Sequence, residues 1–203
     1  TQTCRAERLG MKHETGHRVG GSSSRPGTMN ERGYARELLS DLGFRPSKAR
    51  GQNFLVHPHT AEKIAACMPR VCSTAVEIGA GLGDLTQKLL ARAGVVAAVE
   101  IDRRLAQVLR QRFNTEPEMR FRLIEGDALK IDWEHWLAQT PLPRVLFGNL
   151  PYSISAPLIE KCFQNARLFT EAVLCLQAEV ADRLTSAGGR SMGPRRPRSC
   201  LRG

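Results

Sequence analysis

The segment 147–155, FGNLPYSIS, places an amide and an aromatic ring directly after an apolar run. Asn149 offers a side-chain carbonyl, Leu150 is held extended by the proline that follows it, and Tyr152 offers a flat ring. Together these groups can hold a planar base that carries an amine. Because the apolar run 144–147 is closed by a glycine and a proline, it predicts a buried strand. Asn149 would then lie at the sheet edge where α/β proteins bind ligands.

A glycine turn, GAGLG at residues 79–83, forms a second candidate site. Glycine lacks the Cβ that would keep a ligand away from the backbone, so such a turn allows close contact. The dinucleotide fingerprint G-x-G-x-x-G would need its third glycine at Asp84, where a negative charge is a poor neighbour for a pyrophosphate. The turn therefore favours a cofactor without phosphates, and Asp84 is expected to cap the helix that begins there.

Two acidic residues follow the next two predicted strands. Glu100 is placed to accept hydrogen bonds from both hydroxyls of a ribose, and Asp127 can accept one from an adenine amine. Each acid alone is more often a solvated strand-end residue. Three such features on successive strand ends, however, predict a single pocket for a nucleoside-like cofactor.

The elements that must position these residues alternate between strand and helix, which predicts an α/β fold with a doubly wound, mostly parallel sheet. Strands are predicted at 74–78, 95–99, 119–124, 144–147 and 172–176. Helices are predicted at 31–42, 58–68, 84–93, 103–113, 133–137, 155–163 and 178–184.

In chain order, these motifs resemble those of S-adenosylmethionine-dependent methyltransferases that modify exocyclic amines. Periodicity alone predicts a turn at 51–55, GQNFL. The pairing of this segment with 147–155 is nevertheless similar to the ribosomal RNA adenine N6-dimethyltransferase family, in its KsgA type that acts on the small subunit. The resemblance covers about residues 50–184 and implies a Rossmann-like fold that binds S-adenosyl-L-methionine. The implied cofactor-binding residues are Asn53, Leu55, Gly79, Glu100, Asp127 and Asn149, and the implied catalytic residues are Asn149, Leu150, Pro151 and Tyr152.

The activity that the resemblance implies is dimethylation of adenine N6 in small-subunit, 16S-type ribosomal RNA during ribosome biogenesis. The Asn149 side-chain carbonyl and the Leu150 backbone carbonyl would accept the two hydrogens of the amine, while Tyr152 stacks on the extruded base. The expected partner is the pre-ribosomal small subunit. The chain is expected to be a cytoplasmic monomer without membrane contact.

Three alternatives stay open at this point. A large-subunit ribosomal RNA adenine methyltransferase shares the pocket motifs, although the form FGNL at 147–150 favours the small-subunit enzyme. A relative of the mitochondrial transcription-factor kind would bind nucleic acid without methyl transfer. A nicotinamide-dependent dehydrogenase is disfavoured by Asp84.

The two ends of the chain differ in composition from its middle. The net charge is +10, but residues 1–28 carry five bases against two acids and residues 184–203 five arginines without an acid, so charge is weak support for RNA binding by the folded part. We expect a disordered N-terminal extension at 1–28, an incomplete methyltransferase domain at 29–184, and a disordered basic tail at 185–203 that looks out of frame. The family continues into late strands and a helical domain that holds RNA, so their absence predicts impaired docking on RNA.

Cysteine and histidine patterns predict no metal site. The six cysteines include no C-x-x-C pair, which favours reduced thiols and a cytosolic setting. The string HETGH at 13–17 matches the H-E-x-x-H zinc motif, but Gly16 disfavours the helix that this motif needs. No run of about 18 apolar residues is present to span a membrane.

Overall fold

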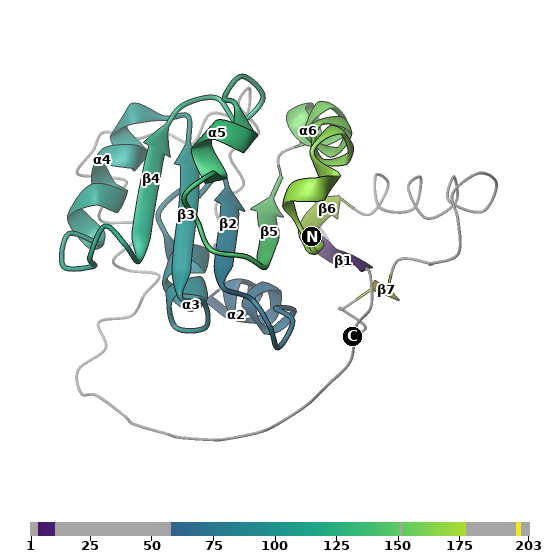
Figure 1. Ribbon diagram of the computed structural model, residues 1–203, viewed down its shortest axis with the longest axis horizontal. Coiled ribbons are helices and arrows are strands. Elements are labelled where there is room, and N and C mark those ends of the chain that lie inside the picture. Colours follow the sequence, from purple (N-terminus) through teal and green to yellow (C-terminus); the bar gives the residue numbers. More distant parts are fainter. Residues whose placement is uncertain (1–3, 11–57, 151, 178–197, 200–203) are drawn as a thin grey trace.

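The computed structural model describes residues 4–10, 58–150, 152–177 and 198–199. Its centre is a seven-stranded sheet with the strand order β4-β3-β2-β5-β6-β1-β7 (Figure 1). The strands are β1 (Cys4–Gly10), β2 (Thr74–Ile78), β3 (Val95–Glu100), β4 (Phe121–Glu125), β5 (Arg144–Asn149), β6 (Glu171–Gln177) and β7 (Arg198–Ser199). The helices are α2 (Pro58–Ala66), α3 (Asp84–Leu90), α4 (Arg103–Arg112), α5 (Trp133–Leu137) and α6 (Tyr152–Gln164), with a 3-10 turn η2 (Ala166–Leu168).

The strands β2 to β6 form a parallel sheet, which confirms the predicted fold class. Every residue of β2 and β3 is buried, because helices cover both faces of a sheet of this kind and its strands are apolar throughout. The direction of the strand order reverses beside β2, since β3 and β4 lie on one side of it and β5 and β6 on the other. Ligands bind at such a switch point, outside the carboxyl ends of the strands.

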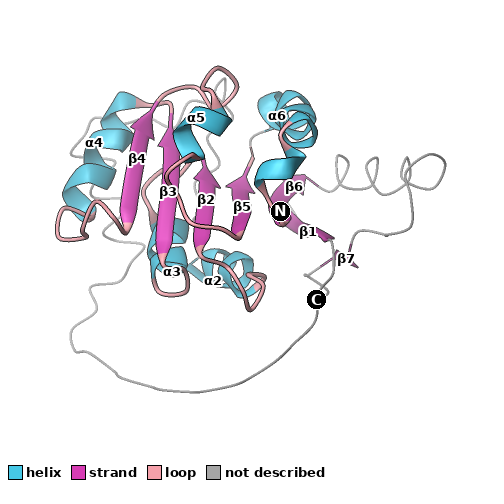
Figure 2. Ribbon diagram, viewed as in Figure 1, coloured by secondary structure: helices cyan, strands magenta, loops and turns pink. Residues whose placement is uncertain are grey.

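Helices lie on both sides of the sheet (Figure 2). Two apolar clusters hold them in place, one on each face. Helices α2, α3 and α4 contribute to the first cluster, with Ile64, Leu89 and Leu109 each 0% exposed. Helices α5 and α6 contribute to the second, with Leu137 and Leu158 each 0% exposed. The alternation of strand residues between the two clusters fixes the register of every parallel strand.

Strand β1 pairs antiparallel with β6, from Cys4 opposite Gln177 to Gly10 opposite Glu171, and β7 pairs with β1 in turn. The expectation that residues 1–28 and 185–203 are disordered therefore does not hold for Cys4–Gly10 or for the two residues of β7. A lone strand carries little local signal, because its hydrogen-bond partners come from elsewhere in the chain. The rest of both segments lies outside the described residues, as do the predicted helices 31–42 and 178–184.

The described cysteines differ in their bonding state. Cys72 and Cys162 carry free thiols, whereas Cys175 on β6 is disulfide-bonded, so the expectation of reduced thiols is wrong at Cys175. Burial raises the pKa of Cys72 to about 11 and that of Cys162 to about 12. Both thiols are therefore poor nucleophiles near neutral pH.

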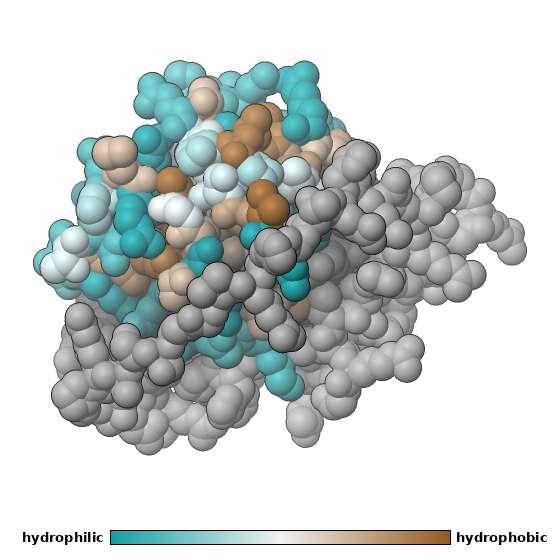
Figure 3. Space-filling view, turned by 60° about the horizontal axis from the view of Figure 1, so that its bottom comes forward, coloured by the Kyte–Doolittle hydropathy of each residue, from teal (hydrophilic) through white to brown (hydrophobic). Residues whose placement is uncertain are grey.

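The lower edge of the molecule in Figure 1 comes forward in Figure 3, where apolar residues are exposed among polar ones. Val71, Met119 and Leu142, which precede β2, β4 and β5, are all more than half exposed. These side chains lie at the edge opposite the carboxyl ends of the strands. Within the described part of the chain, every helix is too short or too polar to cross a membrane.

Candidate functional site

Four predicted site residues lie at the carboxyl edge of the sheet. Ile78 of β2 pairs with Val99 of β3 and with Gly148 of β5. The residues that follow these three are Gly79, Glu100 and Asn149, so they lie at one level along this edge. Asp127 joins them from the end of β4, because the N–H of Gly126 donates to the Glu100 carbonyl at 2.9 Å. The structure thus brings together residues that are up to 70 positions apart in the chain.

The glycine turn begins with backbone in the left-handed region. Gly79 and Gly81 have φ angles of 73° and 60°, in the left-handed region that glycine adopts without strain. The N–H of Gly79 donates to the Val99 carbonyl at 2.9 Å, which fixes the start of the turn against β3. Among the described residues, a Cβ added to Gly79 would meet no atom within 4 Å, so this part of the fold leaves space for a ligand beside Gly79.

Glu100 ties this turn to the end of β3. Its Oε2 accepts a hydrogen bond from the Gly81 N–H at 2.8 Å, and its Oε1 accepts one from the Asp102 N–H at 2.9 Å. The side chain is 5% exposed; burial raises the pKa of Glu100, and the backbone donors act against this rise. Each carboxylate oxygen has two lone pairs, so Glu100 keeps acceptor positions for ribose hydroxyls.

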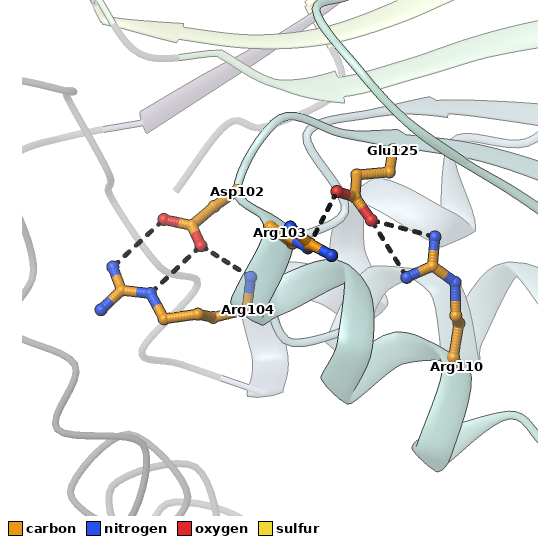
Figure 4. A network of polar contacts seen from close by, with 5 residues as sticks. All are labelled: Asp102, Arg103, Arg104, Arg110 and Glu125. Carbon is orange, nitrogen blue, oxygen red and sulfur yellow. Dashed lines mark hydrogen bonds and ion pairs between the residues drawn. The ribbon is translucent and has the colours of Figure 1, made fainter.

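Charged side chains surround the start of α4 (Figure 4). Asp102 caps this helix by accepting from the Arg104 N–H at 3.0 Å, and the Arg104 side chain folds back onto it at 3.4 Å. Burial alone would raise the pKa of Asp102, but the hydrogen bonds from Arg104 hold it below its usual value. Farther along α4, Arg110 donates two hydrogen bonds of 3.1 Å to Glu125, the last residue of β4, and Arg103 lies 3.7 Å from the same carboxylate. These pairs fix α4 beside the ends of β3 and β4.

Asp127 opens a tight loop after β4. Its Oδ1 accepts from the Leu129 N–H at 2.9 Å, and its carbonyl accepts from the N–H groups of Lys130 and Ile131 at 2.9 and 3.1 Å. The second carboxylate oxygen, Oδ2, lies 4.0 Å from the Lys130 ammonium. The loop therefore holds the Asp127 carboxylate at the sheet edge with acceptor capacity to spare.

The segment after β5 is tied to the neighbouring strand. Strand β5 ends at Asn149, two residues beyond the predicted end at Phe147, and the N–H of the buried Leu150 donates to the Cys175 carbonyl at 3.1 Å. Helix α6 begins at Tyr152, three residues before the predicted start at Ser155. Asn53, Leu55, Pro151 and the Tyr152 side chain lie outside the described residues, so their roles stay predictions.

A comparison with protein families decides the relationship. Residues 43–195 match the family described as "Ribosomal RNA adenine dimethylase". The chain belongs to this family. The predicted resemblance is confirmed.

Individual members of the dimethylase family agree with this assignment. The chain is 40% identical over 171 residues to the ribosomal RNA small subunit methyltransferase A of Moorella thermoacetica, covering 79% of this chain and 58% of that protein. The structure of a dimethyladenosine transferase from Plasmodium falciparum is 35% identical with a TM-score of 0.54, over 63% of this chain and 44% of that one. The structure of the 23S rRNA methyltransferase ErmE is 30% identical with a TM-score of 0.57, over 69% of this chain and 54% of that one. The chain spans about half the length of the curated relatives it matches.

Sequence reasoning assigned no role to Glu77 in this dimethylase-family chain. Glu77 is the second-to-last residue of β2, is 2% exposed, and accepts a hydrogen bond from the Thr86 hydroxyl at 2.6 Å. Burial raises its pKa to about 8, and the nearby carboxylates of Glu100 and Asp84 add to the rise. A lone acid inside an apolar strand is the signal that could have drawn attention to it.

The expected capping role of Asp84 is wrong. Gly83 occupies the cap position without a side-chain hydrogen bond, and Asp84 instead forms a 2.8 Å ion pair with Arg112. Because Arg112 balances its charge, Asp84 is a weaker argument against a phosphate-bearing cofactor than the sequence suggested. Among the described residues, no group of three or more His, Cys, Asp or Glu side chains could hold a metal ion.

Proposed function

We propose that this chain carries the S-adenosyl-L-methionine site and the base-holding site of an enzyme that dimethylates adenine N6 in small-subunit ribosomal RNA. One observation carries the proposal: Gly79, Glu100, Asp127 and Asn149 lie in a row at the switch point of a sheet whose chain belongs to the dimethylase family. Each residue in the row has a distinct task. The whole activity is proposed because the matched part of the chain spans only 58% and 54% of the first two curated relatives.

The residues present fit a nucleoside-like cofactor. The open space beside Gly79 admits a ligand against the backbone, and Glu100 keeps acceptor positions for two ribose hydroxyls. Asp127, whose Oδ1 already accepts from the Leu129 N–H, keeps acceptor capacity for an adenine amine. When bound, S-adenosyl-L-methionine would supply an electrophilic methyl group on its sulfonium.

The base-holding residues act on the amine of the substrate adenine. Its nitrogen is a weak nucleophile, because its lone pair is delocalised into the ring. If the Asn149 side-chain carbonyl and the Leu150 backbone carbonyl accept its two hydrogens, the nitrogen is drawn toward tetrahedral geometry and its lone pair turns out of the ring plane. Tyr152, the first residue of α6, is proposed to stack on the base. Catalysis is then alignment and lone-pair localisation without a protein nucleophile.

The test is methyl transfer from radiolabelled S-adenosyl-L-methionine to pre-ribosomal small subunits, with large-subunit RNA as the competing substrate. Asn149→Ala is expected to lower transfer by about 100-fold or more, since a positioned acceptor at the reacting atom is lost. Asn114→Ala is the matched control, because Asn114 is exposed after α4 and far in sequence from the motif.

Three results would count against the proposal. Full methylation of small-subunit RNA by Asn149→Ala would remove the assigned role of that residue. Preferred methylation of large-subunit RNA would favour the activity named for ErmE, whose structure this chain resembles. Binding of RNA by a chain that never transfers a methyl group would favour a nucleic-acid-binding relative.

A further inference from the structure

Lys161 on α6 reaches the loop that carries Asp127. Its Nζ donates hydrogen bonds to the carbonyl oxygens of Leu129 at 2.8 Å and Ile131 at 2.7 Å. The same ammonium lies 5.4 Å from the centre of the Trp133 ring, within the range of a cation–π contact. One cation from a separate helix thus holds two carbonyls of the loop and the aromatic ring at its end.

Trp133 braces the loop from the inside. Its Nε1 donates to the Ala128 carbonyl at 2.9 Å, its ring is 1% exposed, and Phe169 packs edge-on against it at 5.6 Å. These contacts and the turn of Asp127 keep the loop compact, but they do not attach it to the helix behind the base-holding motif. Lys161 supplies the hydrogen bonds that join the loop to α6.

The surroundings of Lys161 make this attachment specific for a cation. Burial lowers the pKa of the ammonium, and the charges of Asp127 and Asp132 act against that fall. A half-buried ammonium needs acceptors, which the two carbonyls provide, and the carbonyls in turn need a donor. An apolar side chain of similar length would leave both carbonyls without the donor that Lys161 supplies.

We propose that Lys161 is a positioning residue for cofactor recognition, which holds the loop 127–132 so that the Asp127 carboxylate meets the adenine amine of the cofactor. The inference rests on the proposed function, since it needs that cofactor in the pocket. Helix α6 begins at Tyr152, about 13 Å along the helix from Lys161. The helix that holds the cofactor loop is therefore the one that begins at the base-holding motif.

The test compares, by calorimetry on the full chain, the binding of S-adenosylhomocysteine and of its analogue without the 6-amino group. The unaltered protein is expected to prefer the amino-bearing ligand by about 10-fold, the effect of one hydrogen bond to a charged acceptor. Lys161→Met should reduce this preference to about 3-fold or less, as the loop loses its attachment. Lys130→Met should keep it: Lys130 also lies near Asp127, at 4.0 Å, but its side chain is 85% exposed.

A second comparison separates positioning from general stability. If Lys161 acts through Asp127, Lys161→Met has no further effect on the preference once Asp127→Ala is present. A merely structural role would weaken the binding of both ligands equally in either background. Lys161→Gln keeps a donor on a shorter, neutral side chain, so its preference for the amino-bearing ligand should be intermediate. If Lys161→Met fails to fold, Lys161→Gln takes its place in the test.

The outcomes distinguish this inference from the proposed function. An unaltered chain that binds neither ligand overturns both. An unaltered chain that shows the preference, together with Lys161 variants that keep it undiminished, overturns the positioning role alone.

Discussion

At the scale of single residues, the carboxyl group of Glu77 links stability to pH. Burial raises its pKa to about 8 from an ordinary value of 4.5, so within this window the folded chain keeps a proton that the unfolded chain releases. The free energy of unfolding therefore falls as pH rises from 4.5 to about 8 and levels off above it. Glu77→Gln should remove this dependence, worth on the order of a few kcal/mol. Urea denaturation of both proteins at several pH values checks it; parallel pH profiles would contradict it.

Gly83 shows how tightly the glycine turn is packed. Its φ is 86°, and an added Cβ would lie 2.7 Å from Phe113 and 2.8 Å from Leu109. Leu109 lies in α4, Phe113 directly follows this helix, and both are buried. Gly83→Ala is expected to destabilise the fold by about 1–3 kcal/mol through overpacking, with further strain from the left-handed backbone. Gly94→Ala is the control, because its Cβ would approach only the Ser73 carbonyl, at 3.3 Å. Equal melting temperatures for the two variants would show that the turn has room to adjust.

The residues that could be placed from the sequence are those whose position follows from strand ends. Glu100 comes directly after one predicted strand and Asp127 three residues after the next, and parallel strands bring such residues to one edge. The partners of Glu77 and Asp84 could not be predicted in this way. Thr86 and Arg112 reach them only through the packing of α3 and α4, which local pattern does not contain.

At the scale of elements, Arg144 joins β5 to the end of α5. It is 8% exposed, its Nε donates to the Thr140 hydroxyl at 2.7 Å, and one terminal nitrogen donates to the carbonyls of Leu137 and Thr140, each at 2.7 Å. Arg144→Met would remove all three of these buried hydrogen bonds, at a cost of about 2–3 kcal/mol. Arg167→Met, in which a 71% exposed side chain loses its pairing with Glu134, should change stability by less than about 1 kcal/mol. Chemical denaturation compares the two; similar losses would contradict a special role for Arg144.

The core elements were predictable because their burial follows the sequence pattern closely. The strand at 74–78 and the helix at 133–137 match β2 and α5 residue for residue. The start of α6 was placed three residues late, at Ser155, because the polar start of the motif gives no helical periodicity. That shift matters for function, since it makes Tyr152 the first residue of a helix that also carries Lys161.

At the scale of the whole molecule, the sheet is completed by a strand that no local pattern predicted. Cys4–Gly10 includes two arginines, a glutamate and a glycine, which favours an irregular segment when read alone. Its regular structure comes from pairing along the whole length of β6, whose residues Val173 to Leu176 are at most 4% exposed. Pairing between distant segments depends on which sheet edge is open, and this is a property of the assembled fold.

Removal of residues 1–10 should therefore expose the edge of β6 and cause self-association. An open edge strand presents unpaired N–H and C=O groups to other chains, and β6 is too apolar to be protected by charge. Under reducing conditions, sedimentation should show oligomers of the truncated chain, and a synthetic peptide of residues 1–12 should restore the smaller species, while a scrambled peptide should not. Hydrogen exchange at those amides of Glu171–Gln177 that face β1 gives the matching local measure, with protection lost on truncation and regained with the peptide. If the truncated chain sediments like the full one and keeps these amides protected, β1 is not what shields this edge.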